Sequence, residues 1–209
     1  MKTPGLTVVD HPLIGHHLTR LRDASTAPEE FRRRTAAIAS LLLYEVGRTL
    51  PAKPASVVSP MGKARGSQLA REVVLVPVLR AGLGMLQPLL ELLPNARVGC
   101  IGLKRDEHSL QPSCYQQSLP PDLGRSEVIL LEPMLATGGS TVAALELLYS
   151  RRARKVRVLN LLAAPEGIRH VQKLFPDVLI FTAAVDRCLN DRGYIVPGLG
   201  DAGDRLLGV

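Results

Sequence analysis

Short, continuous apolar runs recur through the middle of the chain and alternate with segments of helical periodicity. The runs are Val73–Leu79, Val98–Leu103, Val128–Leu131, Val156–Leu162 and Val178–Val185. Apolar runs of this length are typical of parallel strands that are buried on both faces. Segments with apolar residues three and four positions apart lie between them. The alternation, from about residue 72 to residue 185, predicts an α/β fold in which a doubly wound, mainly parallel sheet is flanked by helices.

Residues 1–50 are predicted to form an N-terminal helical arm. A short amphipathic helix is expected after Pro12, and a longer one from about Pro28 to the end of this segment. Thr26 and Glu29 have the spacing of a capping box for the longer helix. Because one face of that helix is strongly apolar, we expect it to pack on the core or on a partner subunit.

Three segments rich in Pro or Gly are predicted to be irregular. Residues 51–70 are expected to form a loop with one short strand at most. Residues 106–126 are predicted to form a mobile flap that closes over a reactive intermediate, with a disordered surface insertion as the alternative. Residues 186–209 form a glycine-rich tail, whose apolar positions indicate that it is packed and whose backbone could read a flat heterocycle such as a pyrimidine. We expect one domain over residues 1–209.

The stretch from Glu127 to Thr141 carries the clearest chemistry. A strand ends at an acidic residue, Glu132, and a small-residue turn, Ala136–Ser140, then leads into a helix. Glycines let backbone N–H groups close around an anion, and the helix start adds its positive dipole end. The carboxylate would repel a phosphate and is better placed to accept hydrogen bonds from sugar hydroxyls. The stretch therefore predicts a ligand with a phosphate and a ribose, with an ordinary strand-to-helix turn as the alternative.

Other phosphate loops do not fit this spacing, and further cations follow two strands. No Lys follows Gly139 as in a Walker loop, and the Rossmann glycine fingerprint is absent. Arg80 and Arg105 come at the ends of predicted strands, where open α/β sheets bind ligands. The planar guanidinium of Arg80 suits a phosphate or diphosphate, with an ion pair at the edge of the core as the alternative.

Composition narrows the class of partner. The formal net charge of +7 suits either nucleic acid or an anionic small substrate, but aromatic residues make up only 3% and Trp is absent, so nucleic acid is not expected. The basic clusters at 32–34 and 151–155 are expected on solvated faces. The three cysteines are widely spaced, so no disulfide framework is predicted. Because His16 and His17 are adjacent, they predict no protein metal site. No apolar run approaches the ~20 residues of a membrane span, and no signal peptide is visible, so the expected compartment is the cytoplasm.

Several longer motifs together resemble the uracil phosphoribosyltransferase family along nearly the whole chain. They are Asp10–Ile14 with Leu18–Asp23, Leu79–Met85, Pro133–Ser140, Ala163–Gly167 and Gly193–Asp204. The last is long and specific. The resemblance implies a type I phosphoribosyltransferase that converts uracil and phosphoribosyl diphosphate to UMP and diphosphate, with Mg²⁺ bound mainly through the substrate's diphosphate.

The resemblance also implies roles for particular residues. Asp201, Arg105 and Glu132 are expected to be catalytic. Ile195, Gly200, Asp201 and Ala202 are expected to bind uracil. The residues expected to bind phosphoribosyl diphosphate are Arg80, Arg105, Glu132, Pro133, Met134, Leu135, Ala136, Thr137, Gly138, Gly139, Ser140 and Asp201.

The same resemblance implies a homodimer or homotetramer and GTP as an effector, since some family members have these properties. The chain departs from the family pattern at Glu132, where Asp is usual, at Lys104, where Tyr is usual, and at His108, where Glu is common. These departures bear on kinetics and regulation. Two other functions stay open from the sequence: a ligand sensor that binds RNA, and a phosphoribosyltransferase for another base.

Overall fold

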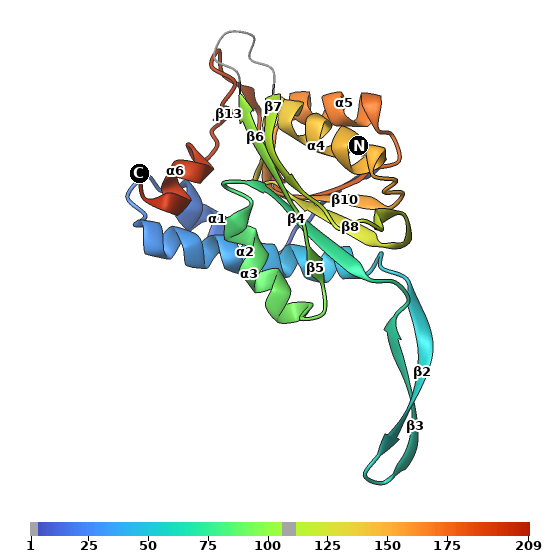
Figure 1. The fold of residues 1–209 in the computed structure, drawn as a ribbon. Helices are drawn as coiled ribbons and strands as arrows, with labels where there is room; N and C mark the ends of the chain where they lie inside the picture. The colour runs from blue at the N-terminus through green and yellow to red at the C-terminus, as the bar shows by residue number, and fades with distance from the viewer. Residues whose placement is uncertain (1–3, 106–111) are drawn as a thin grey trace.

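A nine-stranded sheet organises the chain (Figure 1). The computed structural model describes residues 4–105 and 112–209, without the side chains of Arg105 and Pro112. The main path of the sheet runs β1-β11-β10-β8-β4-β6-β7, with β5 beside β4 and β9 beside β10. Among the described pairs of this sheet, only β6 and β7 are antiparallel. The predicted mainly parallel sheet is confirmed. The strands are β1 (Leu6–Val8), β4 (Val73–Leu79), β5 (Arg97–Val98), β6 (Cys100–Arg105), β7 (Pro112–Ser118), β8 (Glu127–Leu131), β9 (Met134–Leu135), β10 (Val156–Ala163) and β11 (Leu179–Val185).

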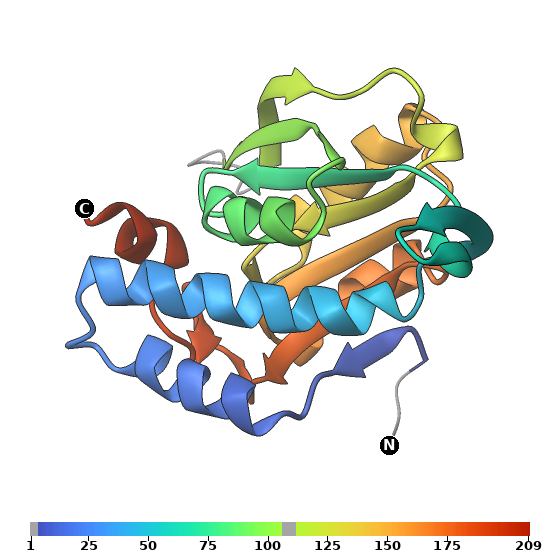
Figure 2. The ribbon, with the colours of Figure 1, turned by 90° about the horizontal axis from the view of Figure 1, so that it is seen from below.

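Helices cover both faces of the sheet (Figure 1). One face carries α1 (Pro12–Arg22), α2 (Pro28–Gly47) and α3 (Leu83–Leu92), and the other carries α4 (Gly139–Ser150) and α5 (Pro165–Leu174). Figure 2 shows the long helix α2 crossing the first face, with α1 and α3 on either side of it. A short C-terminal helix, α6 (Ala202–Leu207), packs on α2. None of the described helices is long and apolar enough to cross a membrane.

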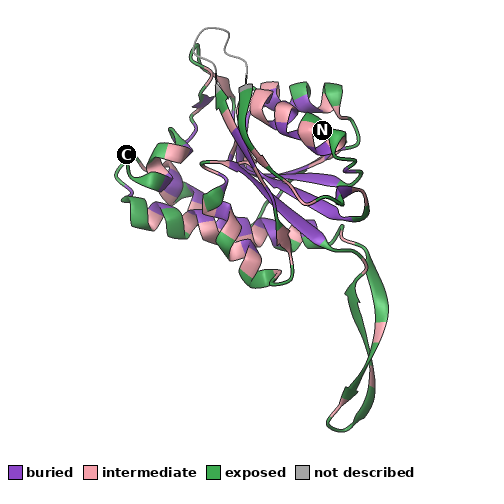
Figure 3. Ribbon diagram, viewed as in Figure 1, coloured by how far each residue is buried: buried purple, intermediate pink, exposed green. Residues whose placement is uncertain are grey.

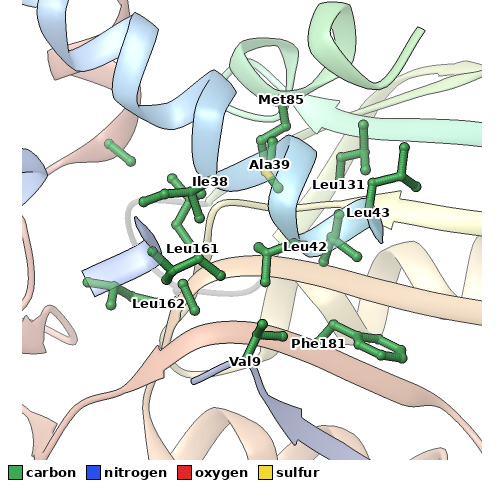
Figure 4. Close-up of a cluster of buried hydrophobic side chains, with 14 of the residues drawn as sticks. Val9, Ile38, Ala39, Leu42, Leu43, Met85, Leu131, Leu161, Leu162 and Phe181 are labelled. Carbon is green, nitrogen blue, oxygen red and sulfur yellow. The ribbon is translucent and has the colours of Figure 1, made fainter. Parts of the chain in front are cut away.

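The core divides in two because side chains alternate across the strands. In β4, Val73 and Leu75 belong to one buried cluster, whereas Val74 and Val76 belong to the other. Figure 3 shows the central strands as almost wholly buried. Figure 4 shows the first cluster, where Leu42 of α2 lies among Leu131, Leu161 and Phe181 of the sheet. This two-sided burial explains why the strands appear in the sequence as continuous apolar runs.

The prediction of a loop over residues 51–70 is wrong. Strands β2 (Ala52–Ser59) and β3 (Gly62–Leu69) form a separate antiparallel hairpin. The hairpin extends well away from the body of the molecule (Figure 1) and is exposed along most of its length (Figure 3). Because neither of its faces packs on the core, its sequence carries no two-residue hydrophobic alternation.

Three features of the N-terminal arm also differ from expectation. Strand β1 was not predicted and joins the edge of the sheet beside β11. The capping box is wrong, because Ala27 is the N-cap residue and the Thr26 hydroxyl instead donates to the Arg20 carbonyl at 2.6 Å. Helix α2 begins at Pro28 as expected but ends at Gly47, short of residue 50.

The basic cluster at 32–34 is not simply solvated. Arg33 is exposed, but Arg32 donates to the Leu206 carbonyl at 2.8 Å, and Arg34 pairs with Glu30 at 3.0 Å. The expectation of a solvated face therefore holds for Arg32 and Arg33, which are exposed, and fails for half-buried Arg34.

The predicted flap is largely regular structure. Strand β7 pairs with β6, and the short 3₁₀ helix η1 (Leu123–Arg125) buries Leu123. Residues 106–111 lie outside the described part of the chain. The predicted packing of the tail is confirmed, since Ile195 and Leu199 are buried. The tail also contains α6 and a small antiparallel pair, β12 (Cys188–Leu189) and β13 (Ile195–Val196), which were not predicted.

Candidate active site

A cleft of about 800 Å³ opens where the carboxyl ends of β4 and β8 meet the tail. Its walls come from four parts of the sequence that are far apart: the ends of these two strands, the β6–β7 pair, and the tail. The residues lining it are Val78, Leu79, Arg80, Ala81, Leu103, Lys104, Tyr115, Glu132, Pro133, Met134, Ala136, Ser140, Arg192, Gly193, Tyr194, Ile195, Gly200, Asp201, Ala202, Gly203 and Asp204. The carboxylate-and-turn segment and the glycine-rich tail therefore share one cleft.

The turn before α4 has the backbone geometry of an anion site. Gly138 is the N-cap residue and adopts φ +83°, a left-handed conformation that favours glycine. Helix α4 begins at Gly139, so its first amides have no acceptor in a preceding turn of the helix. Ser140 lines the cleft in this first turn. These amides and the helix dipole can bind a phosphate group.

Helix α5 supports this turn from behind. A Cβ atom on Gly167 would collide with the Ala136 carbonyl oxygen, so glycine is needed for the close approach. The His170 ring nitrogen Nδ1 lies 2.9 Å from the Thr137 carbonyl oxygen. The sequence placed Gly167 inside a family-like motif without giving it this role, and it gave no signal for His170.

Glu132 lies directly after β8 and lines the cleft. Burial raises the pKa of its carboxyl group to about 7, although the Thr141 hydroxyl opposes this shift by donating a hydrogen bond of 2.5 Å to Oε2. The main-chain carbonyl of Glu132 accepts a hydrogen bond from Asn160 Nδ2 at 2.6 Å. Near neutral pH the side chain can therefore accept hydrogen bonds as a carboxylate or donate one as a carboxylic acid.

Cationic side chains also line the cleft. Arg80 follows β4 and Lys104 lies in β6, and both are exposed at the cleft. Within the described residues Arg80 makes no ion pair, which removes the support for the alternative of a structural ion pair. Tyr115 of β7 lies against Gly102, where a Cβ atom would collide with the ring. The hairpin of β6 and β7 thereby adds an aromatic side chain to the cleft that sequence reasoning missed.

The tail contributes main-chain groups and a carboxylate. Gly200 adopts φ +80°, and Asp201 follows it as the N-cap residue of α6, accepting from the Asp204 amide at 3.0 Å. Ile195, Gly200 and Asp201 all line the cleft. Arg192 and Tyr194 line it as well, although sequence reasoning assigned no role to either.

Most of the residues predicted from the sequence are brought together in this cleft. Those that line it are Arg80, Glu132, Pro133, Met134, Ala136, Ser140, Ile195, Gly200, Asp201 and Ala202. Thr137, Gly138 and Gly139 form the turn beside it without lining it, and Leu135 is fully buried in the core, so its side chain cannot reach a ligand there. The side chain of Arg105 lies outside the described part of the structure.

The carboxylates at the cleft provide oxygen atoms that could bind Mg²⁺. Glu132, Asp201 and Asp204 offer oxygen ligands, the type that Mg²⁺ prefers. Among residues 4–105 and 112–209, no group of three or more potential metal-binding side chains is clustered. Oxygen atoms at these positions would fit a Mg²⁺ ion that a substrate diphosphate carries into the cleft.

Comparison with known proteins identifies the family of this chain. The family model described as uracil phosphoribosyltransferase matches residues 8–209. Uracil phosphoribosyltransferase from Symbiobacterium thermophilum is 53% identical over 204 residues, covering 97% of this chain and 98% of that protein. The enzyme of the same name from Dictyoglomus turgidum is 51% identical over 202 residues, covering 96% and 98%.

Solved structures agree at the level of the fold. The structure of an Aquifex aeolicus protein superposes with a TM-score of 0.93 and 40% identity, covering 98% of each chain. A hypoxanthine-guanine phosphoribosyltransferase from Bacillus anthracis superposes with a TM-score of 0.51 at 11% identity, covering 75% of this chain and 79% of that one, which shows a shared fold alone. The match to the family model and the identity to these relatives over nearly the whole chain establish that this chain belongs to the uracil phosphoribosyltransferase family.

Proposed function

We propose that this protein transfers the 5-phosphoribosyl group from phosphoribosyl diphosphate to uracil, giving UMP and diphosphate. The observation that carries the proposal is the single cleft that joins two recognition surfaces. The turn at residues 136–140 and Glu132 suit a ribose phosphate, and the backbone at 195–202 suits a pyrimidine edge. The relatives named above carry this activity in their names.

The proposed reaction exchanges one bond at the ribose. The C–O bond to diphosphate breaks at the anomeric carbon of the ribose and a bond forms to N1 of uracil. The N1 proton passes to the departing diphosphate or to water. Positive charge develops on the ribose ring as diphosphate leaves. A protein can promote such a step by alignment and by preorganised charge, without a covalent nucleophile.

Each group of residues has a role in this proposal. Glu132 accepts hydrogen bonds from the ribose hydroxyls, and the turn before α4 binds the 5′-phosphate. Arg80 and Arg105 bind the diphosphate, and exposed Lys104 adds a cation at the cleft. Uracil lies against the main chain at Ile195 and at Gly200–Ala202, with Asp201 between the base and the diphosphate. Mg²⁺, when bound to the diphosphate, neutralises the charge of the leaving group.

One assay tests the reaction class and the base together. Purified protein, Mg²⁺ and phosphoribosyl diphosphate are incubated with labelled uracil, and with cytosine, orotate and hypoxanthine in parallel. The expected result is UMP from uracil and little product from the other bases. A preference for another base would identify that base as the substrate in place of uracil. Absence of any nucleotide product at every protein concentration would remove the proposed activity. Omitting Mg²⁺ or adding a chelator is expected to abolish turnover.

The β2–β3 hairpin supports a further part of the proposal, a homodimer or homotetramer. An isolated two-stranded hairpin is marginally stable in water. This hairpin nevertheless extends from the body and exposes Val58 and Met61 at 83% and 96%. A second copy of the chain would cover these side chains. Analytical ultracentrifugation tests this: the wild type is expected to be oligomeric, and Val58→Lys with Met61→Lys is expected to dissociate it, whereas a monomeric wild type would refute it.

GTP activation and the compartment stay predictions. GTP as an effector rests on the family likeness, and turnover measured with and without GTP at subsaturating substrate tests it. Cell fractionation tests the expected cytoplasmic location.

A further inference from the structure

A bidentate ion pair joins the N-terminal arm to the glycine-rich tail. Arg22, the last residue of α1, donates from both terminal nitrogens to Asp186, with distances of 2.7 Å to Oδ2 and 2.6 Å to Oδ1. Asp186 directly follows β11, and its amide donates to the Ala163 carbonyl at 2.9 Å. Two parallel N–H···O bonds fix the relative orientation of guanidinium and carboxylate, which a lysine could not do.

Both partners of this pair also bind Gly198. The Gly198 amide donates to Asp186 Oδ2 at 2.8 Å, and the Gly198 carbonyl accepts from Arg22 at 2.8 Å. The ion pair therefore occupies both main-chain polar groups of one residue. Gly198 adopts φ +64°, and a Cβ atom there would collide with the Ile195 carbonyl oxygen. The loop at residues 195–201 is thus held at a point where only glycine fits.

A second guanidinium holds the next residue of this loop from the same side. Arg205 of α6 donates to the Leu199 carbonyl at 2.8 Å, to the Asp23 carbonyl at 2.6 Å, and to the Leu21 carbonyl. Its guanidinium lies 4.4 Å from the centre of the Phe31 ring of α2. Two consecutive carbonyls of the loop are therefore tied to the arm, immediately before Gly200 and Asp201, which line the cleft.

The burial of the ion pair argues for a role in positioning rather than in stability alone. The Asp186 side chain is only 6% exposed and that of Arg22 is 26% exposed. Desolvation offsets much of the attraction in such pairs, and hydrophobic replacements are often as stable. What the pair provides here is a fixed path for the loop, since Arg22 and Asp186 hydrogen-bond to both main-chain polar groups of Gly198.

We infer that Arg22 and Asp186 are positioning residues for base recognition: from outside the cleft, they set the main-chain geometry with which residues 195–201 bind the pyrimidine. The inference rests on the proposed function for the identity of the base. It predicts a selective effect on one substrate, because the phosphate turn at 136–140 is supported separately by α5.

Steady-state kinetics with both substrates tests the inference. Arg22→Lys keeps the charge but loses the fork and a hydrogen bond, and Asp186→Asn keeps the shape but loses the charge. Each variant is expected to raise the KM for uracil about tenfold while changing the KM for phosphoribosyl diphosphate less than about twofold. Arg34→Lys is the matched control, because Arg34 is 28% exposed and pairs with Glu30 at 3.0 Å without touching the tail. An equal rise in both KM values, or no change in either, would overturn the inference.

Amide hydrogen exchange keeps the test decisive if a variant folds poorly or the enzyme uses another base. In the wild type the Gly198 amide is expected to exchange slowly, since it is hydrogen-bonded to Asp186. In Arg22→Lys, the segment at 195–201 is expected to exchange at least about tenfold faster, with exchange at 136–142 unchanged. Uniformly faster exchange across the molecule would indicate general destabilisation and overturn the positioning role. A wild type that makes no UMP but shows the selective change would remove the proposed function alone.

Discussion

The Thr141 hydroxyl donates a hydrogen bond of 2.5 Å to the Glu132 carboxyl group, whose pKa burial nevertheless raises from 4.5 to about 7. The folded protein therefore holds a proton on Glu132 at pH values where the unfolded chain has lost it. Between pH 4.5 and 7 the folded state binds more protons, so this group lowers the free energy of unfolding as pH rises. Above pH 7 the whole effect should be present, at no more than about 3 kcal/mol because Glu132 lines the open cleft.

Replacing Glu132 by Gln should remove this pH dependence. At pH 8, Glu132→Gln is expected to be more stable than the wild type by up to about 3 kcal/mol, and the difference should disappear near pH 4 because both states are then protonated. Urea unfolding at the two pH values measures it. A stability difference that is the same at both would show that the carboxyl group is not titrating in this range.

The same titration should appear in substrate binding. Ionised Glu132 accepts hydrogen bonds from ribose hydroxyls better than the neutral acid does, so affinity for phosphoribosyl diphosphate should rise as pH passes about 7. Glu132→Gln should bind more weakly at pH 8 and lack this rise. The phosphates of the substrate also titrate in this pH range. Calorimetry from pH 6 to 8.5 therefore compares the affinity of Glu132→Gln for phosphoribosyl diphosphate with that of the wild type. Identical pH profiles would remove the ribose role.

Substitutions of Thr141 test the pKa of the Glu132 carboxyl group independently. Thr141→Val keeps the shape of a buried residue but removes the hydrogen bond, which stabilises the ionised form. The pH midpoint of substrate binding is expected to rise by about one unit. Thr141→Ser keeps the hydroxyl and should leave the midpoint near that of the wild type. Equal midpoints in all three proteins would mean that the hydrogen bond does not tune Glu132.

The sequence predicted those parts of the fold in which the burial of an element produces a hydrophobic pattern in its sequence. Strands β4 and β10 are buried on both faces, so continuous apolar runs mark them. The hairpin at 52–69 faces solvent on both sides and left no such pattern. The cleft was anticipated because a strand end, a carboxylate and a glycine turn are consecutive in the sequence. The tie between Arg22 and the tail was not, because its partners stand 164 and 176 positions away.

Two helical glycines provide a matched test of the support behind the phosphate turn. Gly15 of α1 has open space around its Cβ position, whereas a Cβ on Gly167 of α5 would collide with the Ala136 carbonyl. Gly15→Ala should therefore stabilise the protein by about 0.5–1 kcal/mol through helix propensity. Gly167→Ala should instead destabilise it by about 1–3 kcal/mol and weaken binding of phosphoribosyl diphosphate, since the turn must shift. Similar stability and affinity in the two variants would show that α5 does not position the turn.

The far end of the sheet contains a buried ion pair whose role is structural. Arg157 of β10 donates to Glu127 Oε2 at 2.7 Å and to the Thr49 carbonyl at 2.7 Å, and the two charged residues are 5% and 2% exposed. Arg157→Met leaves the Glu127 charge buried, and Arg71 at 3.6 Å is then its one ion-pair partner within the described part of the chain. The variant is expected to cost about 3–5 kcal/mol.

Two controls separate this effect from ordinary charge removal. Arg33→Ala breaks the Glu29 pair at 3.8 Å, whose side chains are 73% and 78% exposed, and should change stability by less than about 0.5 kcal/mol. The double variant Glu127→Leu with Arg157→Met removes both buried charges and should recover most of the lost stability, because the cost arises from one uncompensated charge. Chemical denaturation of the three variants decides the point. If the double variant is as unstable as Arg157→Met, the loss comes from the missing contact to Thr49, which anchors the end of α2 to the sheet.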